Sequence, residues 1–141
     1  MRSKNRRIDA LRHIVTYCDD LEKFLLGFSR EAFDRDLRTI RAVLYSLQTI
    51  GEAAIRLDKD EKRRAVDGEL EGRYPQIPWR DVRGMSNFVR HQYDEIDLDL
   101  VWTTATKSIF PIRDAAKLEI ARLEGLVEDN FTDIDDELPS L

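Results

Sequence analysis

The chain has 141 residues, of which 42% are hydrophobic and 36% are charged, and its net charge is −5 at pH 7. These values fit one globular domain and exclude a protein whose whole surface attracts nucleic acid, although a local basic site could still hold RNA phosphates. No apolar run approaches the roughly 20 residues that span a bilayer, and none follows the basic N-terminus as in a secretory signal, so we expect a cytoplasmic protein with no membrane partner. One cysteine excludes an intrachain disulfide, and with only two histidines we expect no metal and no cofactor.

Apolar residues recur at helical spacing in four segments of the chain. The predicted helices cover residues 5–27, 31–57, 79–93 and 98–126. Gly51 lies within the second helix, where a glycine costs about 1 kcal/mol relative to alanine, so we expect close packing against another helix there. Pro111 lies within the fourth helix and predicts a kink.

The links between these helices are mostly short, which favours an all-α fold. We expect an antiparallel up-down bundle of about four main helices, formed by residues 1–127. Within it, residues 58–72 are charged and poor in apolar side chains, and they fit either a loose helix or a surface loop. The acidic residues 128–141 are predicted to form a mobile tail.

A polar stripe follows the third predicted helix. At about 100° per residue, five polar side chains share one side of it. They are Arg83, Ser86, Asn87, Arg90 and His91. The apolar residues on the opposite side are expected to face the bundle, and they are Val82, Met85, Phe88 and Val89. A stripe of this kind is also typical of an ordinary solvent-exposed helix face, so the spacing alone does not identify a catalytic site.

The residue types of this stripe suit RNA cleavage without a metal. The 2′-hydroxyl must lose a proton to attack the adjacent phosphate, the leaving 5′-oxygen must gain one, and an imidazole such as that of His91 can do either. Arginine binds the negative charge that gathers on the phosphate. Asn87 and Ser86 can orient the phosphate or the base. Because one chain supplies one histidine to the stripe, a dimer would complete an acid–base pair.

Several motifs between about residues 8 and 122 resemble those of the HEPN superfamily, specifically its HepT-like toxin branch. The matching positions are Asp9 and His13, residues 47–54, residues 75–79, residues 84–93 and residues 97–102. The resemblance implies a helical bundle that forms a homodimer, with a shared cleft holding two copies of the motif. It also implies a toxin that acts as a metal-independent endoribonuclease and is paired with a nucleotidyltransferase antitoxin.

The family motif has an arginine, then a histidine five residues later, then a tyrosine two residues further on. His91 and Tyr93 match it, and the resemblance makes Tyr93 the candidate acceptor of an AMP group from the antitoxin. Ser86 stands where the family has its arginine. Arg83 or Arg90 could supply the guanidinium, and we prefer Arg83 because Arg83, Asn87 and His91 form an i, i+4, i+8 row. The alternative is a catalytically impaired HEPN-type protein that binds the antitoxin.

The remaining notable residues are expected to be structural. They are His13 as a hydrogen-bonded histidine, Cys18 as a core residue, and Trp79 and Trp102 as anchors of the bundle. Glu52 could form an ion pair with Arg83 or Arg90 or point at the cleft, and we favour a structural role.

Overall fold

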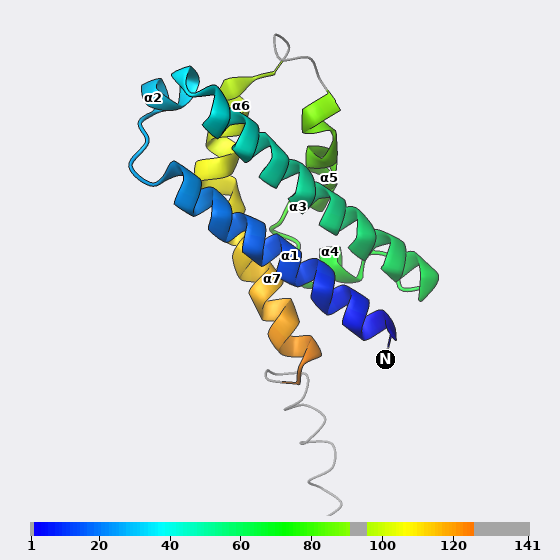
Figure 1. The fold of residues 1–141 in the computed structure, drawn as a ribbon. Coiled ribbons are helices and arrows are strands. Elements are labelled where there is room, and N and C mark those ends of the chain that lie inside the picture. Colours follow the sequence, from blue (N-terminus) through cyan, green and yellow to red (C-terminus); the bar gives the residue numbers. More distant parts are fainter. Residues whose placement is uncertain (1, 91–95, 126–141) are drawn as a thin grey trace, which may run out of the picture.

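The computed structural model of the protein describes residues 2–90 and 96–125, and within these residues it is all-α, with no strand (Figure 1). The α-helices are α1 (Arg2–Leu25), α2 (Arg30–Arg35), α3 (Leu37–Arg63), α4 (Glu69–Arg73), α5 (Trp79–Gly84), α6 (Leu98–Thr103) and α7 (Ile109–Leu123). A 3-10 segment, η1 (Met85–Arg90), continues α5, and a π-helical segment, η3 (Thr104–Ser108), joins α6 to α7. No helix in the described ranges is both long and apolar enough to cross a bilayer.

The two longest helices, α1 and α3, lie antiparallel and form the centre of the bundle (Figure 1). Helix α7 packs on α1, whereas α5 and η1 pack on another face of α3. The interface of α1 and α3 contains fully buried side chains such as Leu11, Ile14, Val43, Leu47 and Ile50. The predicted all-α antiparallel bundle is therefore confirmed.

The expected helix over residues 31–57 is wrong in one respect, because it is two helices. Asp36 lies between α2 and α3 in an extended conformation, with φ −108° and ψ 93°. Its carboxylate accepts a hydrogen bond from the Thr39 N–H, and its own N–H donates to the Phe33 carbonyl. One aspartate thus ends the first helix and caps the second. The apolar spacing runs on through this break, so periodicity does not show it.

Residues 58–72 combine both predicted possibilities. Helix α3 continues to Arg63, a turn with positive φ at Ala65 and Gly68 follows, and α4 begins at Glu69. Contrary to a surface position, Asp60 and Glu61 are buried.

Pro111 predicts a kink, and the structure has the π-helical segment η3 just before it. Proline has no N–H to donate to the carbonyl four residues earlier, which belongs to Lys107 within η3. Prolines and π-helical turns are both recognised causes of irregular helix geometry, and here they lie three residues apart.

Cys18, Trp79 and Trp102, which are expected to be structural, lie in the core or pack against it. Cys18 is fully buried, burial raises the pKa of its thiol to about 12, and its Sγ lies 3.8 Å from the Ile109 carbonyl oxygen. The Trp79 indole N–H donates to the Tyr74 carbonyl at 3.1 Å. Trp102 packs on Phe33, with ring centroids 5.2 Å apart. These contacts confirm the structural interpretation.

Candidate functional site

The predicted polar stripe begins on α5, whose position is fixed by its apolar side. Trp79 and Val82 on α5 are buried, and so is Met85 at the start of η1. Phe88 packs against the same core, whereas Asn87 is exposed and Ser86 is half-buried. The predicted division into an apolar side and a polar side therefore holds for these residues.

Gly51 on α3 fixes the start of the motif. A Cβ added at Gly51 would lie 2.9 Å from the carbonyl carbon of Met85, 3.0 Å from the Ser86 Cα, and closer still to the Ser86 nitrogen. These are backbone atoms, so a side chain at residue 51 would push η1 away from α3. The close packing expected at Gly51 is confirmed, and its partner is the segment that carries Ser86.

The helical geometry of this segment differs from the prediction. Residues 85–90 form a 3-10 helix, in which side chains repeat every three residues rather than every 3.6. The predicted i, i+4 relation between Arg83 and Asn87 requires an α-helix through both residues, whereas the 3-10 segment begins at Met85. His91, Tyr93 and the side chain of Arg90 lie outside the described residues.

Arg83 contacts a carboxylate that the sequence pattern does not indicate. Its Nη1 lies 3.2 Å from Oε1 of Glu71 on α4, whereas Glu52, the expected partner, is exposed on α3. The Glu71 side chain is 53% exposed, and an ion pair so open to solvent contributes little free energy. A phosphate could therefore displace Glu71 from Arg83 at small cost.

A hollow lies beside the motif, between η1 and the start of α6. It has a volume of about 310 Å³ and is lined by Gly84, Asn87 and Phe88 on one side and by Leu100 and Val101 on the other. A larger hollow of about 600 Å³ shares Phe88 and Leu100 with it. Their walls are mainly apolar, which suits a nucleobase or an apolar side chain of a partner. Within the described ranges, no cluster of histidine, cysteine and acidic side chains is arranged to hold a metal ion.

His13 is hydrogen-bonded, as expected, but it lies on the surface. Its Nδ1 is 2.8 Å from Nη2 of Arg56, so a contact across the α1–α3 interface holds both side chains. Arg56 follows Gly51 by five positions, which places it about 140° around the α3 axis from Gly51. The contact of His13 with Arg56 is therefore on a different side of α3 from the motif.

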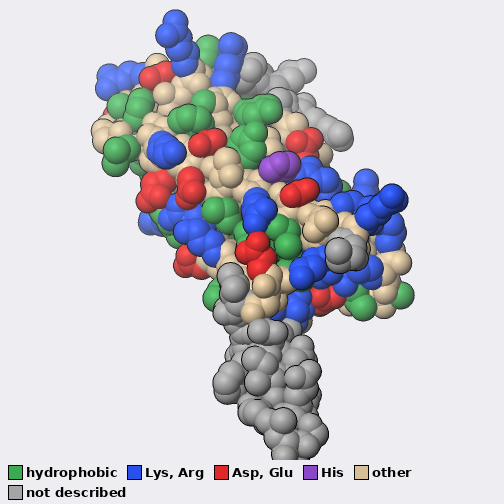
Figure 2. All heavy atoms as spheres, turned by 60° about the horizontal axis from the view of Figure 1, so that its bottom comes forward, with side chains coloured by type: hydrophobic (Ala, Val, Ile, Leu, Met, Phe, Trp, Pro, Cys, Tyr) green, Lys and Arg blue, Asp and Glu red, His purple; other side chains and the backbone are tan. Residues whose placement is uncertain are grey.

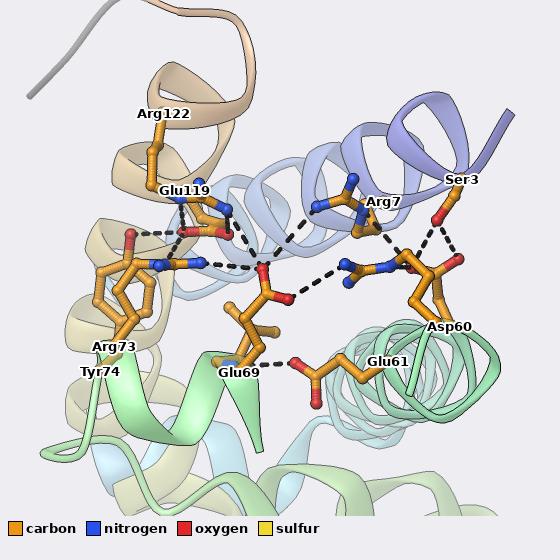
Figure 3. Close-up of polar contacts among 11 residues, drawn as sticks. Ser3, Arg7, Asp60, Glu61, Glu69, Arg73, Tyr74, Glu119 and Arg122 are labelled. Carbon is orange, nitrogen blue, oxygen red and sulfur yellow. Dashed lines mark hydrogen bonds and ion pairs between the residues drawn. The ribbon is translucent and has the colours of Figure 1, made fainter. Parts of the chain in front are cut away.

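A polar network ties together four helices at the end of the bundle where α1 begins (Figure 3). Glu119 on α7 accepts hydrogen bonds from Tyr74, Arg73 and Arg122. Glu69 on α4 pairs with Arg64 and Arg73 at 3.1 and 2.9 Å.

Asp60 on α3 completes this network and reaches α1. It accepts hydrogen bonds from Ser3 and Arg64, both at 2.8 Å, and pairs with Arg7 at 3.5 Å. Burial by itself would raise the pKa of Asp60, but these hydrogen bonds and positive charges lower it below its usual value. Direct partners in the network are up to 62 positions apart along the chain, as Arg7 and Glu69 are, so local patterns give no sign of it.

The sequence comparisons agree with this fold and motif. The model of the family described as "Ribonuclease HepT-like" matches residues 14–119. A relative from Methanocaldococcus jannaschii, named "Putative RNase MJ1216", is 31% identical over 86% of this chain and 93% of its own length. A "Probable ribonuclease HepT" from Thermococcus cleftensis is 30% identical over 75% of this chain and 88% of its own length. No solved structure matches the chain significantly.

An all-α bundle with this motif segment packed on α3 defines a helical protein of the HEPN type. The chain belongs to the HepT-like ribonuclease family, as the resemblance predicted.

Proposed function

We propose that the protein is a metal-independent endoribonuclease, the toxin of a toxin–antitoxin pair, whose site lies at a homodimer cleft. The observation that carries this proposal is the contact of Gly51 with the Ser86 backbone, because it fixes the start of the family's motif segment on the longest helix. A catalytic group works only when its position is fixed to within a fraction of an ångström. Family membership supports ribonuclease activity in general.

In this proposal His91 transfers protons, from the 2′-hydroxyl or to the leaving 5′-oxygen. Arg83 or Arg90 binds the phosphate, and Asn87 orients it. Arg83 is available for this role because its contact with Glu71 is open to solvent. A second protomer supplies the second histidine, so that one imidazole acts as base and the other as acid.

The test is incubation of the purified, partner-free protein with a labelled RNA in the presence of EDTA. We expect cleavage that leaves cyclic phosphate ends and is abolished in His91→Ala. The matched control is His13→Ala, which removes the other histidine and should cleave normally at saturating RNA. Cleavage by His91→Ala at the wild-type rate would refute the assigned role.

A nucleotidyltransferase antitoxin is the proposed partner, with Tyr93 as acceptor of AMP. Incubation with the nucleotidyltransferase and ATP should add the mass of AMP to the wild type and not to Tyr93→Phe. An unchanged mass of the wild type would contradict this part of the proposal.

One observation favours a second candidate function. Ser86 occupies the position of the family's arginine, and it is half-buried, with its backbone against Gly51 of α3. A catalytically impaired protein that only binds the antitoxin would co-purify with the nucleotidyltransferase, yet a folded, partner-free dimer would leave RNA intact.

A further inference from the structure

A groove lies between the exposed faces of α1 and α3, apart from the motif. Its volume is about 390 Å³, and its basic side chains are Arg6, Arg7, Arg56, Lys59 and Arg63. Figure 2 shows lysine and arginine side chains gathered at the end of the molecule where α1 begins. The whole chain has a net charge of −5, so this concentration of positive charge runs against the overall composition.

The carboxylates that line the groove neutralise few of the arginine and lysine charges that are exposed at its surface. Asp60 is 3% exposed, and its closest partners, Arg64 and Arg7, lie 2.8 and 3.5 Å away. Arg6 and Arg63 lie at 4.0 and 3.9 Å from Asp60, and their side chains are 53% and 61% exposed. These two arginines therefore keep most of their hydrogen-bonding capacity for a ligand, and of the carboxylates that line the groove only that of Asp9 is exposed.

Helix α3 holds three of the basic side chains in a row. Arg56, Lys59 and Arg63 follow one another at intervals of three and four residues, so they lie along one face of α3. The hydrogen bond from Arg56 to Nδ1 of His13 fixes the middle of the groove and uses only one of the five N–H groups of that guanidinium.

An aromatic pair, formed by the exposed Tyr45 and the half-buried Tyr17, lies further along the same face. Tyr45 precedes Arg56 by eleven residues, or about three helical turns, and Tyr17 follows His13 by about one turn. The two rings make an edge contact with centroids 6.2 Å apart, and Tyr45 is 60% exposed. The ring of Tyr45 therefore lies about 16 Å along α3 from Arg56. A positively charged groove and an exposed aromatic ring on one face are the combination that binds single-stranded nucleic acid.

We infer that this α1–α3 groove is a second binding site for single-stranded RNA, in which the basic side chains contact phosphates and Tyr45 stacks on a base. The choice of RNA rests on the proposed ribonuclease function. The groove would hold RNA that flanks the segment at the motif, and it would thereby contribute to affinity without taking part in the chemistry.

The test measures binding of a fluorescent 2′-O-methyl RNA, which has no free 2′-hydroxyl and is not cleaved, by anisotropy at several salt concentrations. For single strands each phosphate contact contributes about 0.7 to the slope of log affinity against log salt. Lys59→Gln/Arg63→Gln should therefore lower the slope by about 1.4 and raise Kd about 25-fold at 0.1 M salt. The matched control, Lys107→Gln/Lys117→Gln, removes the same charge from exposed positions on η3 and α7 and should bind like the wild type.

Two further variants separate the expected contributions. Tyr45→Ala should raise Kd about fivefold or more with an unchanged salt slope, because stacking releases no counterions. Asp9→Asn should tighten binding, because it removes the exposed carboxylate of the groove. Unfolding temperatures equal to that of the wild type would show that each variant is folded.

Wild-type protein that does not bind the oligonucleotide, or a double variant that binds like the wild type, would overturn the inference. The outcome is independent of cleavage. If the wild type binds through the groove but does not cleave RNA, the groove stands and the ribonuclease proposal fails. If the wild type cleaves RNA in a His91-dependent way and the groove variants bind normally, the ribonuclease proposal stands and the groove inference fails.

Discussion

Replacing Gly51 with alanine tests whether the close approach of η1 to α3 holds the motif in place. In a helix without this neighbour, glycine to alanine would stabilise by about 1 kcal/mol. Here the added Cβ would lie within 2.9 to 3.0 Å of the Met85 carbonyl carbon and the Ser86 Cα. Overpacking of this kind costs about 1 to 3 kcal/mol. The steric cost exceeds the helical gain, and we expect a net loss of about 1 kcal/mol.

The assay is thermal unfolding followed by circular dichroism, with RNA cleavage as a second readout. For a domain of this size the expected loss lowers Tm by about 4 °C, and displacement of η1 should lower the cleavage rate as well. Gly72→Ala is the matched control, because Gly72 lies within α4 and an added Cβ there meets no atom within 4 Å. A Gly51→Ala protein as stable as Gly72→Ala would refute the reasoning.

Three further predictions concern charge and burial. If Arg83 binds the phosphate, Arg83→Ala should lower the cleavage rate about 100-fold, whereas Glu71→Gln, which frees Arg83, should not lower it; equal rates for Arg83→Ala and wild type would exclude this role. The pKa values of the Asp60 and Glu69 carboxyls are lower in the folded state than in the unfolded chain. Their ionised forms therefore stabilise the fold above the ordinary carboxyl pKa of about 4. This stabilisation is lost as pH falls through the lowered pKa values of the folded state. Urea unfolding of Asp60→Asn should accordingly show lower stability than wild type at pH 7 and a smaller decline in acid, and an unchanged pH profile would contradict this. Cys18, fully buried and with its pKa raised to about 12, should resist alkylation at neutral pH until denaturant is added, and rapid reaction of the native protein would contradict its position in the core.

Local sequence determined the class of fold and the place of the candidate motif. Apolar residues at helical spacing define α1 and most of α3 and α7, because this spacing records which side of a helix is buried. Gly51 marked a close approach for a similarly local reason, since a glycine inside a helix is unfavourable unless a neighbour needs the space. The motif around Ser86 and Asn87 was also recognisable, because its residue types and spacing are contiguous in the chain.

Only the tertiary structure decided the features that depend on distant partners. The break at Asp36 interrupts a continuous apolar pattern, and the partner of Arg83 proved to be Glu71 rather than Glu52. Residues 85–90 form a 3-10 helix instead of the expected α-helix, and this segment packs closely on α3 at Gly51.

The two charged regions outside the motif arise in the same way. The network around Asp60 and Glu119 and the basic groove between α1 and α3 combine side chains from helices that are remote in sequence. Composition shows only that the chain is charged and acidic overall. The antiparallel packing of α1 against α3 buries Asp60 among arginines and leaves Arg6 and Arg63 exposed, and this packing is what converts scattered charges into a positive groove.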